Sequence, residues 1–245
     1  MKLYSKSSGE FIILYKLPND RCIVKFLDTG TEAEVIYGNA LKGTIKDHHK
    51  RTCCGVGFLG EGRHRRYNTK AGMYWQFMLN RCYLPKYKEQ HPTYEDCVVC
   101  DYWHNFQNFA EWCSYQTGCG IPNTNLDKDL LLKGNKVYGP DTCCFLPQEI
   151  NKAITKQTLF KAGLPIGVTT RDDLGGKYMA RLSLASSGRP KKEKYLGLFA
   201  TPELAFGAYK QAKEEQIKFL ANKFRDRLTG NAYTALMEFE VNIED

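Results

Sequence analysis

The sequence lacks any long apolar run. No 18 consecutive apolar residues occur among its 245, so no membrane-spanning helix is expected. Its first six residues, Met1-Lys2-Leu3-Tyr4-Ser5-Lys6, lead into polar residues and give no signal peptide. These absences favour a cytoplasmic protein without a membrane partner, in which the ten cysteines are reduced thiols.

Two common binding motifs are missing or incomplete. Cys97 and Cys100 have the spacing of half a zinc site, and the adjacent Cys143-Cys144 could supply more thiolates, but no second Cys-x-x-Cys pair exists. Residues 97–103 are more typical of a buried strand that turns into a helix, so structural zinc is not expected. The glycine-rich stretch 55–62 lacks the Gly-Lys-Ser/Thr ending of a phosphate loop, and we interpret it as a linker or turn.

What the sequence does have is a localised basic excess. The net charge is +8, and residues 151–230 hold 16 Lys and Arg against 7 Asp and Glu, a difference of +9 (16 − 7). The rest of the chain is close to neutral, at −1 (8 − 9). A basic excess confined to one part of a chain favours a polyanionic partner, of which nucleic acid is the commonest.

Two segments precede this basic part. Residues 9–15, 21–27 and 34–37 are strand-like and separated by turns, which predicts a small, curled β unit. Residues 74–83 and 101–112 carry apolar and aromatic side chains at helical spacing. We expect these aromatics to form a core, with a base-stacking platform as the alternative.

The basic part holds a pattern of strands and one helix. Residues 177–184 alternate with period two, and residues 195–199 form a second strand-like run that one glycine interrupts. Thr201-Pro202-Glu203 then opens a helix, with a hydroxyl at the N-cap, proline at the first position and a carboxylate in the first turn. The sequence predicts two or three antiparallel strands backed by one amphipathic helix.

This unit resembles the DNA-binding domain of plant APETALA2/ethylene-response factors over about residues 163–225. The matching pieces are Gly167-Val168, Gly176-Lys177-Tyr178-x-Ala180, Tyr195-Leu196-Gly197-x-Phe199, Thr201-Pro202-Glu203-x-Ala205 and Ala208-Tyr209. In that family the sheet enters the major groove, which implies that basic side chains of the sheet contact phosphates and base edges. A solvated basic face is the alternative. The side chains implied are Arg171, Lys177, Arg181, Arg189, Lys191, Lys192 and Lys194.

Residues 126–151 carry the clearest chemical signal. Leu126-Asp127-Lys128-Asp129, then Gly134-Asn135-Lys136-Val137-Tyr138-Gly139-Pro140, then a cysteine-containing strand and a helix that ends at Asn151, are the layout of a ββα-metal finger. This stretch resembles the HNH endonucleases of phages, and the resemblance spans about residues 71–155. It implies a phage protein that acts in the cytoplasm of an infected bacterial host. Trp75, Met78, Arg81, Cys82 and Tyr83, with Trp103-His104-Asn105-Phe106, also match.

The HNH resemblance also assigns roles in the hydrolysis of DNA. Asp127 and Asn151 would bind one divalent cation, Mg²⁺ or alternatively Mn²⁺, while Asn135 would hold the loop geometry. Lys128 stands where most HNH nucleases place the water-activating histidine, and a protonated lysine is a poor base. Either Lys128 is the base, or His104 or His91 replaces it, or cleavage has been lost. In the structural alternative, Asp127 and Asp129 merely cap a turn.

We therefore expect an α+β protein with three modules and a tail. Residues 1–62 form a β-rich module that is a candidate DNA-binding module, and residues 63–155 an HNH-like ββα domain with flanking helices. Residues 163–228 form an APETALA2-type domain in which a three-stranded sheet packs on one helix. Residues 229–245 form an acidic tail with a short helix and a frayed end. The expected function is a homing-type endonuclease on double-stranded DNA; the alternatives are a non-catalytic DNA-binding regulator with a degenerate finger and an RNA-binding accessory protein.

Overall fold

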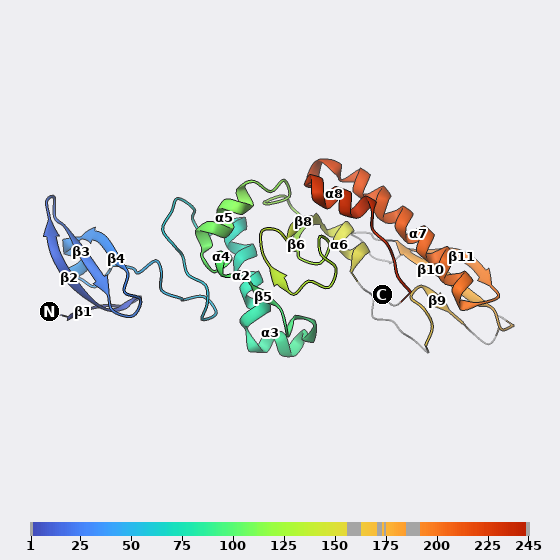
Figure 1. The fold of residues 1–245 in the computed structure, drawn as a ribbon, viewed down its shortest axis with the longest axis horizontal. Coiled ribbons are helices and arrows are strands. Elements are labelled where there is room, and N and C mark those ends of the chain that lie inside the picture. The colour runs from blue at the N-terminus through green and yellow to red at the C-terminus, as the bar shows by residue number, and fades with distance from the viewer. Residues whose placement is uncertain (1, 156–162, 171–172, 174, 185–191, 244–245) are drawn as a thin grey trace. The chain divides into compact units, whose positions relative to one another are not determined.

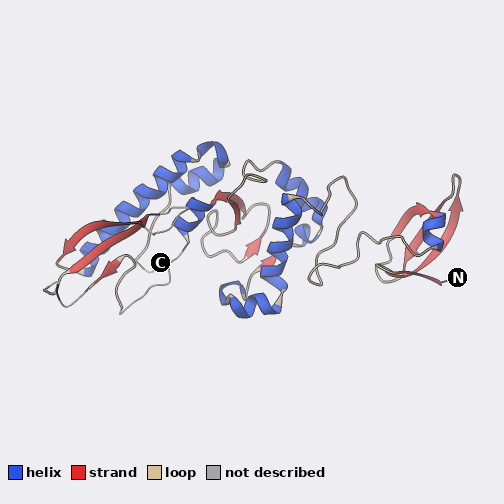
Figure 2. Cartoon of the chain, turned by 180° about the vertical axis from the view of Figure 1, so that it is seen from behind, coloured by secondary structure: helices blue, strands red, loops and turns tan. Residues whose placement is uncertain are grey.

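The computed structural model describes residues 2–155, 163–170, 173, 175–184 and 192–243 (Figure 1). Helices and small sheets alternate along this part of the chain (Figure 2), which confirms the α+β class. The chain divides into two compact units, Met1–Ser114 with Lys136–Gly139 and Tyr115–Asn135 with Pro140–Asp245. The domain boundaries expected from the sequence stay predictions. None of the helices in the described ranges has the length and hydropathy that a bilayer crossing requires.

The first unit begins with a four-stranded antiparallel meander. Its strands are β1 (Lys2–Ser5), β2 (Gly9–Leu17), β3 (Arg21–Phe26) and β4 (Glu32–Ile36), in that spatial order. Side chains of β3 alternate in burial, so one sheet face holds a core around Phe11, Val24 and Phe26. The short helix α1 (Tyr37–Leu41) joins this core through Ala40. The sequence pattern does not predict β1, and it assigns Tyr37 to a strand that in fact ends at Ile36.

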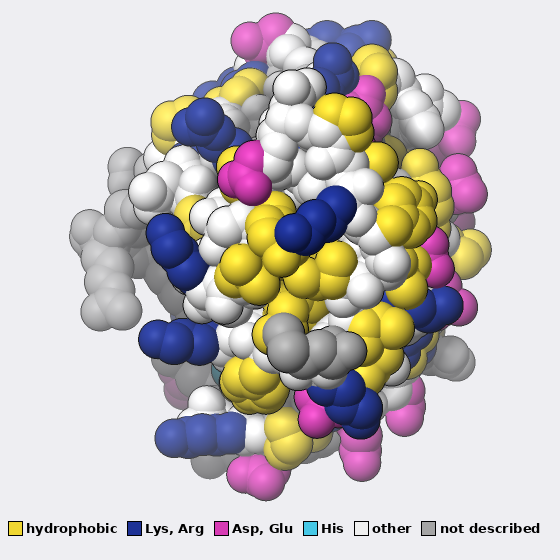
Figure 3. All heavy atoms as spheres, turned by 90° about the vertical axis from the view of Figure 1, so that its left-hand side faces the viewer, with side chains coloured by type: hydrophobic (Ala, Val, Ile, Leu, Met, Phe, Trp, Pro, Cys, Tyr) yellow, Lys and Arg dark blue, Asp and Glu magenta, His cyan; other side chains and the backbone are white. Residues whose placement is uncertain are grey.

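The outer surface of this sheet mixes apolar and basic groups. In Figure 3, hydrophobic side chains gather in the middle of the view with Lys and Arg around them. Tyr4 and Tyr15 are among the sheet's exposed apolar residues. Two of its lysines are paired with glutamates, Lys2 with Glu10 at 3.0 Å and Lys25 with Glu32 at 3.4 Å. These pairs lower the positive charge that the sheet offers to a polyanion.

The rest of the first unit is a small helical core. Trp75, Trp103, Phe106 and Phe109 are fully buried, and the Trp75 indole donates to the Trp103 carbonyl at 2.7 Å. These aromatics therefore form a core, as expected, and not a stacking platform. The expected helix 101–112 is broken at Asn105, whose extended backbone pairs with Phe58. The elements are α2 (Lys70–Tyr83), α3 (Pro85–Gln90), the 3-10 helix η1 (Pro92–Tyr94), β5 (Val98–Val99), α4 (Asp101–His104) and α5 (Phe106–Ser114).

The second unit holds a strand–strand–helix segment. Strand β6 (Thr124–Asp127) pairs antiparallel with β8 (Cys144–Pro147), and α6 (Gln148–Ile154) follows β8 directly and packs against both strands. This is the order expected for residues 126–151, although α6 continues past Asn151 to Ile154. Strand β7 (Val137–Tyr138), in the connection between β6 and β8, belongs to the first unit, where it pairs in parallel with β5.

The C-terminal part of the second unit is a three-stranded antiparallel sheet backed by a long helix. The sheet order is β11 (Lys192–Phe199), β10 (Tyr178–Leu184) and β9 (Val168–Thr169), and α7 (Pro202–Lys223) packs on all three strands. Thr201 caps the helix by accepting the N–H of Leu204 at 3.3 Å. Leu182 and Tyr209 lie in the core shared by sheet and helix. The expected sheet on one helix is confirmed.

Gly167 allows the chain before β9 to approach α7 closely. Its φ is +78°, and a Cβ at this position would lie 2.0 Å from the Tyr209 ring. Only glycine combines this positive φ with the absence of a Cβ, so any other residue would shift the strand or the ring. The glycine of the Gly167-Val168 pair therefore has a packing reason that is independent of any ligand.

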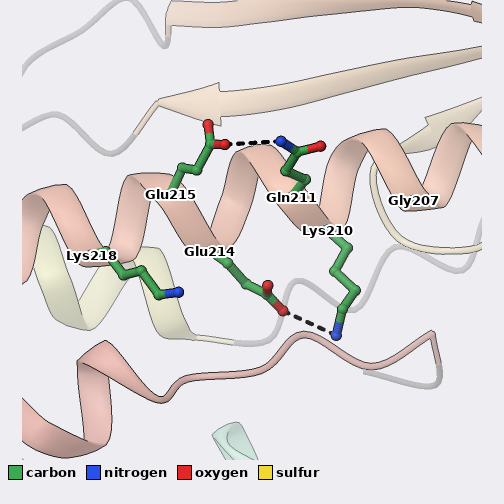
Figure 4. A pocket seen from close by; sticks show the side chains of 6 residues that line it. All are labelled: Gly207, Lys210, Gln211, Glu214, Glu215 and Lys218. Atoms are coloured by element: carbon green, nitrogen blue, oxygen red, sulfur yellow. Dashed lines mark hydrogen bonds and ion pairs between the residues drawn. The ribbon is translucent and has the colours of Figure 1, made fainter.

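The chain ends in a segment that is held along α7. It follows the 3-10 helix η3 (Arg225–Arg227) and helix α8 (Gly230–Met237). The Val241 N–H donates to Glu214 at 3.0 Å, and its carbonyl accepts from Lys210 at 2.8 Å. Lys210 and Glu214 also pair with each other at 3.0 Å (Figure 4). The expected short helix is present, but the expected frayed end is wrong as far as Val241, because burial of this side chain and two backbone hydrogen bonds fix it.

Candidate functional site

Asp127, the last residue of β6, begins the loop that resembles an HNH finger. Its Oδ1 accepts the backbone N–H groups of Asp129 at 3.0 Å and Leu130 at 2.8 Å. Burial raises the pKa of this carboxyl above its ordinary value, although the two backbone donors favour the charged form. One oxygen of Asp127 thus caps a turn, as in the structural alternative, which leaves Oδ2 as the donor that a cation would use.

Lys128 is buried, with only 8% of its side chain exposed. Its ammonium donates to the Asn135 carbonyl and to the Asp129 carboxylate, each at 2.7 Å. In return, the Asn135 amide donates to the Lys128 carbonyl at 2.9 Å. The two residues therefore clamp the ends of loop 128–135 together, which is the role expected for Asn135. The same geometry ties Lys128 Nζ to two acceptors of its own loop and gives no support to Lys128 as the base.

Asn151 lies in the middle of α6 and is partly exposed. Its carbonyl accepts the Thr155 N–H at 3.0 Å and the Thr155 hydroxyl at 2.6 Å, which ends the helix one turn later. Leu146, Ile150 and Ala153 are buried in one cluster that holds α6 on the β8 side of the hairpin. Since α6 also packs against β6, Asp127 and Asn151 lie on adjoining elements of one folded segment.

These two residues fit a hard divalent cation in their donor chemistry. A carboxylate and a side-chain amide carbonyl both offer oxygen, and Mg²⁺ typically binds through one or two carboxylates, several waters and substrate phosphates. Across the described ranges, no group of three or more His, Cys, Asp or Glu side chains is arranged to hold a metal ion. Any cation bound by these two side chains would need water or phosphate oxygens as its remaining ligands.

The alternative bases lie in the first unit and have local partners. Burial lowers the pKa of His104 below its ordinary value, and its Nε2 is 3.2 Å from the Tyr83 hydroxyl. Its Nδ1 is 3.5 Å from the Asp101 carboxylate. His91 is exposed, with its ring centroid 4.5 Å from that of Tyr87. His104 thus contacts Tyr83 of α2 and Asp101 of its own helix, and His91 contacts Tyr87 of the preceding helix α3.

The cysteines of the half zinc site also have local contacts. Cys97 is buried and its thiol donates to the Thr93 carbonyl at 3.8 Å. Burial raises the pKa of Cys100 and of Cys144 above the ordinary thiol value. All ten cysteines are thiols in the structure.

The predicted DNA-contacting side chains of the C-terminal sheet do not share one face. Arg181 pairs across the strands with Tyr195, whereas Lys194 pairs with the core residue Leu182. Directly paired residues share a sheet face, so Arg181 lies on the open side and Lys194 on the side of α7. Lys177, just before β10, is exposed. Arg171, Arg189 and Lys191 lie outside the described residues, and of Lys192 only the backbone, paired with Leu184, is described.

A basic surface in the first unit escaped the sequence reasoning. Residues 63–70, Arg-His-Arg-Arg-Tyr-Asn-Thr-Lys, contain four Lys and Arg in eight residues and no acid. They lead into α2, beside a surface cavity of about 520 Å³. The net charge of the residues outside 151–230 hides this run, because acidic residues elsewhere cancel it; a short sliding window would have found it. The other cavity, about 290 Å³ along α7, is lined by Lys210, Glu214 and their neighbours (Figure 4), whose charges pair with one another and the tail.

Comparison with known proteins gives no match: no family, no curated protein and no solved structure corresponds to this chain.

Proposed function

We propose that this chain is a sequence-specific endonuclease that binds double-stranded DNA and hydrolyses it at the β6–β8–α6 segment. The observation that carries the proposal is the packing of α6 against β6 and β8, because it puts Asn151 on an element that adjoins Asp127. These are the two positions to which the HNH resemblance assigns the cation. No other pair of oxygen donors in the finger combines that resemblance with neighbouring elements.

Asp127 and Asn151 would hold a divalent cation, most simply Mg²⁺, which when bound stabilises charge on the scissile phosphate and the leaving oxygen. The backbone donors at Asp129 and Leu130 fix Oδ1 of Asp127 and so orient its carboxylate. The Lys128–Asn135 clamp keeps the loop closed behind that carboxylate. The protein's own contribution would thus be two oxygen donors held on packed elements, β6 and α6.

DNA recognition is assigned to the C-terminal unit. Its sheet carries an exposed arginine, Arg181, whose guanidinium contacts an exposed carboxylate, Glu193, at 3.5 Å and the Met179 sulfur at 3.3 Å. An exposed pair of this kind is weak and can be exchanged for a base edge or a phosphate. Lys177 and Lys194 are exposed and would contact phosphates, Lys194 from the edge strand β11 because it does not share the open face of Arg181.

A second candidate function is a non-catalytic DNA-binding regulator. The burial of Lys128 and its two hydrogen bonds favour it, because the residue in the usual place of the base is committed to holding the loop. In that case the strand–strand–helix segment is a scaffold and only the basic sheet is functional.

Incubation of the full chain with supercoiled DNA separates the two functions. With Mg²⁺ or Mn²⁺ the endonuclease converts supercoiled DNA to the nicked or linear form, and excess EDTA stops it. Binding in a gel-shift assay without any cleavage, in either metal and over a range of pH, would leave the regulator. Absence of both binding and cleavage would refute the two proposals together.

A further inference from the structure

The segment that leads into α2 forms a second exposed basic surface, remote in sequence from the C-terminal sheet. Arg65, Tyr67 and Lys70 are exposed, with Tyr67 at 70%. Arg63 is 76% exposed and is paired with Glu111 at 3.2 Å. This surface, residues 63–70 with the adjoining cavity, has no acidic residue in its own run.

Local contacts hold the surface in one shape. The Arg66 guanidinium donates to Gln76 and lies 5.2 Å from the ring centres of both Tyr67 and Trp75. Trp75 is fully buried, so Arg66 anchors the segment to the helical core. Gly72 completes this anchoring, because a Cβ there would lie 1.8 Å from the Arg66 carbonyl. A basic run that is fixed in this way loses little conformational entropy when it binds a ligand.

The cavity beside this run has the chemistry of a polyanion site. It measures about 520 Å³, and its lining includes Arg66, Tyr67 and Lys70 but no Asp or Glu. Two cationic groups and a flat, exposed aromatic ring at its edge suit a phosphate followed by a sugar, since aromatic rings pack on sugars and bases while Lys and Arg neutralise phosphates. An acidic peptide would also find the cations but would leave the aromatic edge without a matching flat group.

We propose that residues 63–70 bind the phosphodiester backbone of DNA, as a contact additional to the C-terminal sheet. The choice of DNA as the polyanion rests on the proposed function. Physically, a second backbone contact on the other folded unit would raise the number of phosphates neutralised and hence both the affinity and its salt dependence.

The test compares two full-length triple variants that remove the same charge from the first unit. One is Arg63→Gln/Arg65→Gln/Lys70→Gln; the control is Lys86→Gln/Lys88→Gln/Lys136→Gln, which changes lysines outside the surface. Duplex binding is measured between about 50 and 200 mM salt, after circular dichroism has verified folding. We expect the slope of log affinity against log salt to become shallower by about 2 to 3 in the first variant and to change little in the control. If the first triple variant does not fold, the single variants Arg65→Gln and Lys70→Gln are tested instead. Each should make the slope of log affinity against log salt shallower by about 0.9.

The possible outcomes are distinct. Wild-type binding with equal slopes in the two triple variants overturns this inference and leaves the proposed function standing. Failure of the wild type to bind any duplex DNA refutes the proposed function itself. If wild type binds an RNA duplex more tightly than DNA, and the surface variant weakens only RNA binding, the choice of DNA is wrong. Photocrosslinking of bromodeoxyuridine-substituted DNA to Tyr67, lost in Tyr67→Ala, would place the strand at this surface.

Discussion

The finger loop and the C-terminal sheet use their charged side chains in opposite ways. In the loop, Lys128 is buried and bonded to groups within seven residues of itself. In the sheet unit, Lys177 and Lys194 are exposed on different sides of the strands. A buried lysine with hydrogen bonds to its own loop fixes the loop conformation, while an exposed lysine is available to a ligand. The difference teaches that burial, more than residue type, decides which charges can serve a partner.

The largest expected effect is the loss of cleavage at the finger. Asp127→Ala should lower the nicking rate by about 100-fold or more, because it removes a proposed metal ligand, while DNA affinity changes little. Supercoiled-plasmid nicking and gel shift measure the two quantities. Asp129→Ala is the matched control, since that carboxylate is exposed, contacts Lys128 and is not one of the two proposed ligands. Equal activity of wild type and Asp127→Ala would exclude Asp127 from catalysis.

The buried Lys128–Asn135 clamp should contribute to the unfolding free energy. Lys128→Met keeps an apolar chain but removes the buried hydrogen bond to the Asn135 carbonyl, which we expect to cost about 1–3 kcal/mol of unfolding free energy. Lys177→Met, at an exposed position, should cost at most about 0.5 kcal/mol. Urea denaturation provides both values. Similar small losses of unfolding free energy in Lys128→Met and Lys177→Met would mean that the clamp does not stabilise the fold and that the two lysines do not differ as described.

The exposed lysines should affect the salt dependence of DNA binding instead of stability. Lys177→Gln/Lys194→Gln should reduce the slope of log affinity against log salt by about 2 without changing unfolding free energy. Lys152→Gln/Lys218→Gln removes the same charge from exposed positions on α6 and α7 and serves as the control. A slope that is unchanged in the first variant would take these two lysines out of the DNA interface.

The smallest expected effect concerns His104. Its folded-state pKa is lowered from 6.5 by burial, so below this value the unfolded state binds more protons than the folded state. Stability should therefore be full above pH 6.5 and should fall as the pH drops from there toward the lowered pKa. Thermal unfolding at pH 7 and pH 5 measures this loss, and His104→Gln should show less of it. An identical pH dependence in the two proteins would mean that another group is responsible.

The sequence predicts local features well where the signal is itself local. Thr201-Pro202 marks the start of α7 because N-cap and proline act within one turn. The sequence does not reveal the Lys128–Asn135 clamp, which depends on how deeply the loop is buried. Nor does it reveal the break at Asn105, which is set by pairing with Phe58, or the docking of Val241 on Lys210 and Glu214. The last two features arise between segments that are distant in the chain, and no pattern in either segment alone encodes them.

Calorimetric titration of Mn²⁺ into the complex of the full chain with a cleavage-resistant phosphorothioate duplex tests the central claim most directly. The claim is that Asp127 and Asn151 hold a cation at the DNA backbone. The account predicts a binding event in the wild-type complex that is weakened by about 10-fold or more in both Asp127→Ala and Asn151→Ala, with unchanged binding in Asp129→Ala. Equal Mn²⁺ binding by all four proteins would contradict the claim and leave the DNA-binding regulator as the function of this chain.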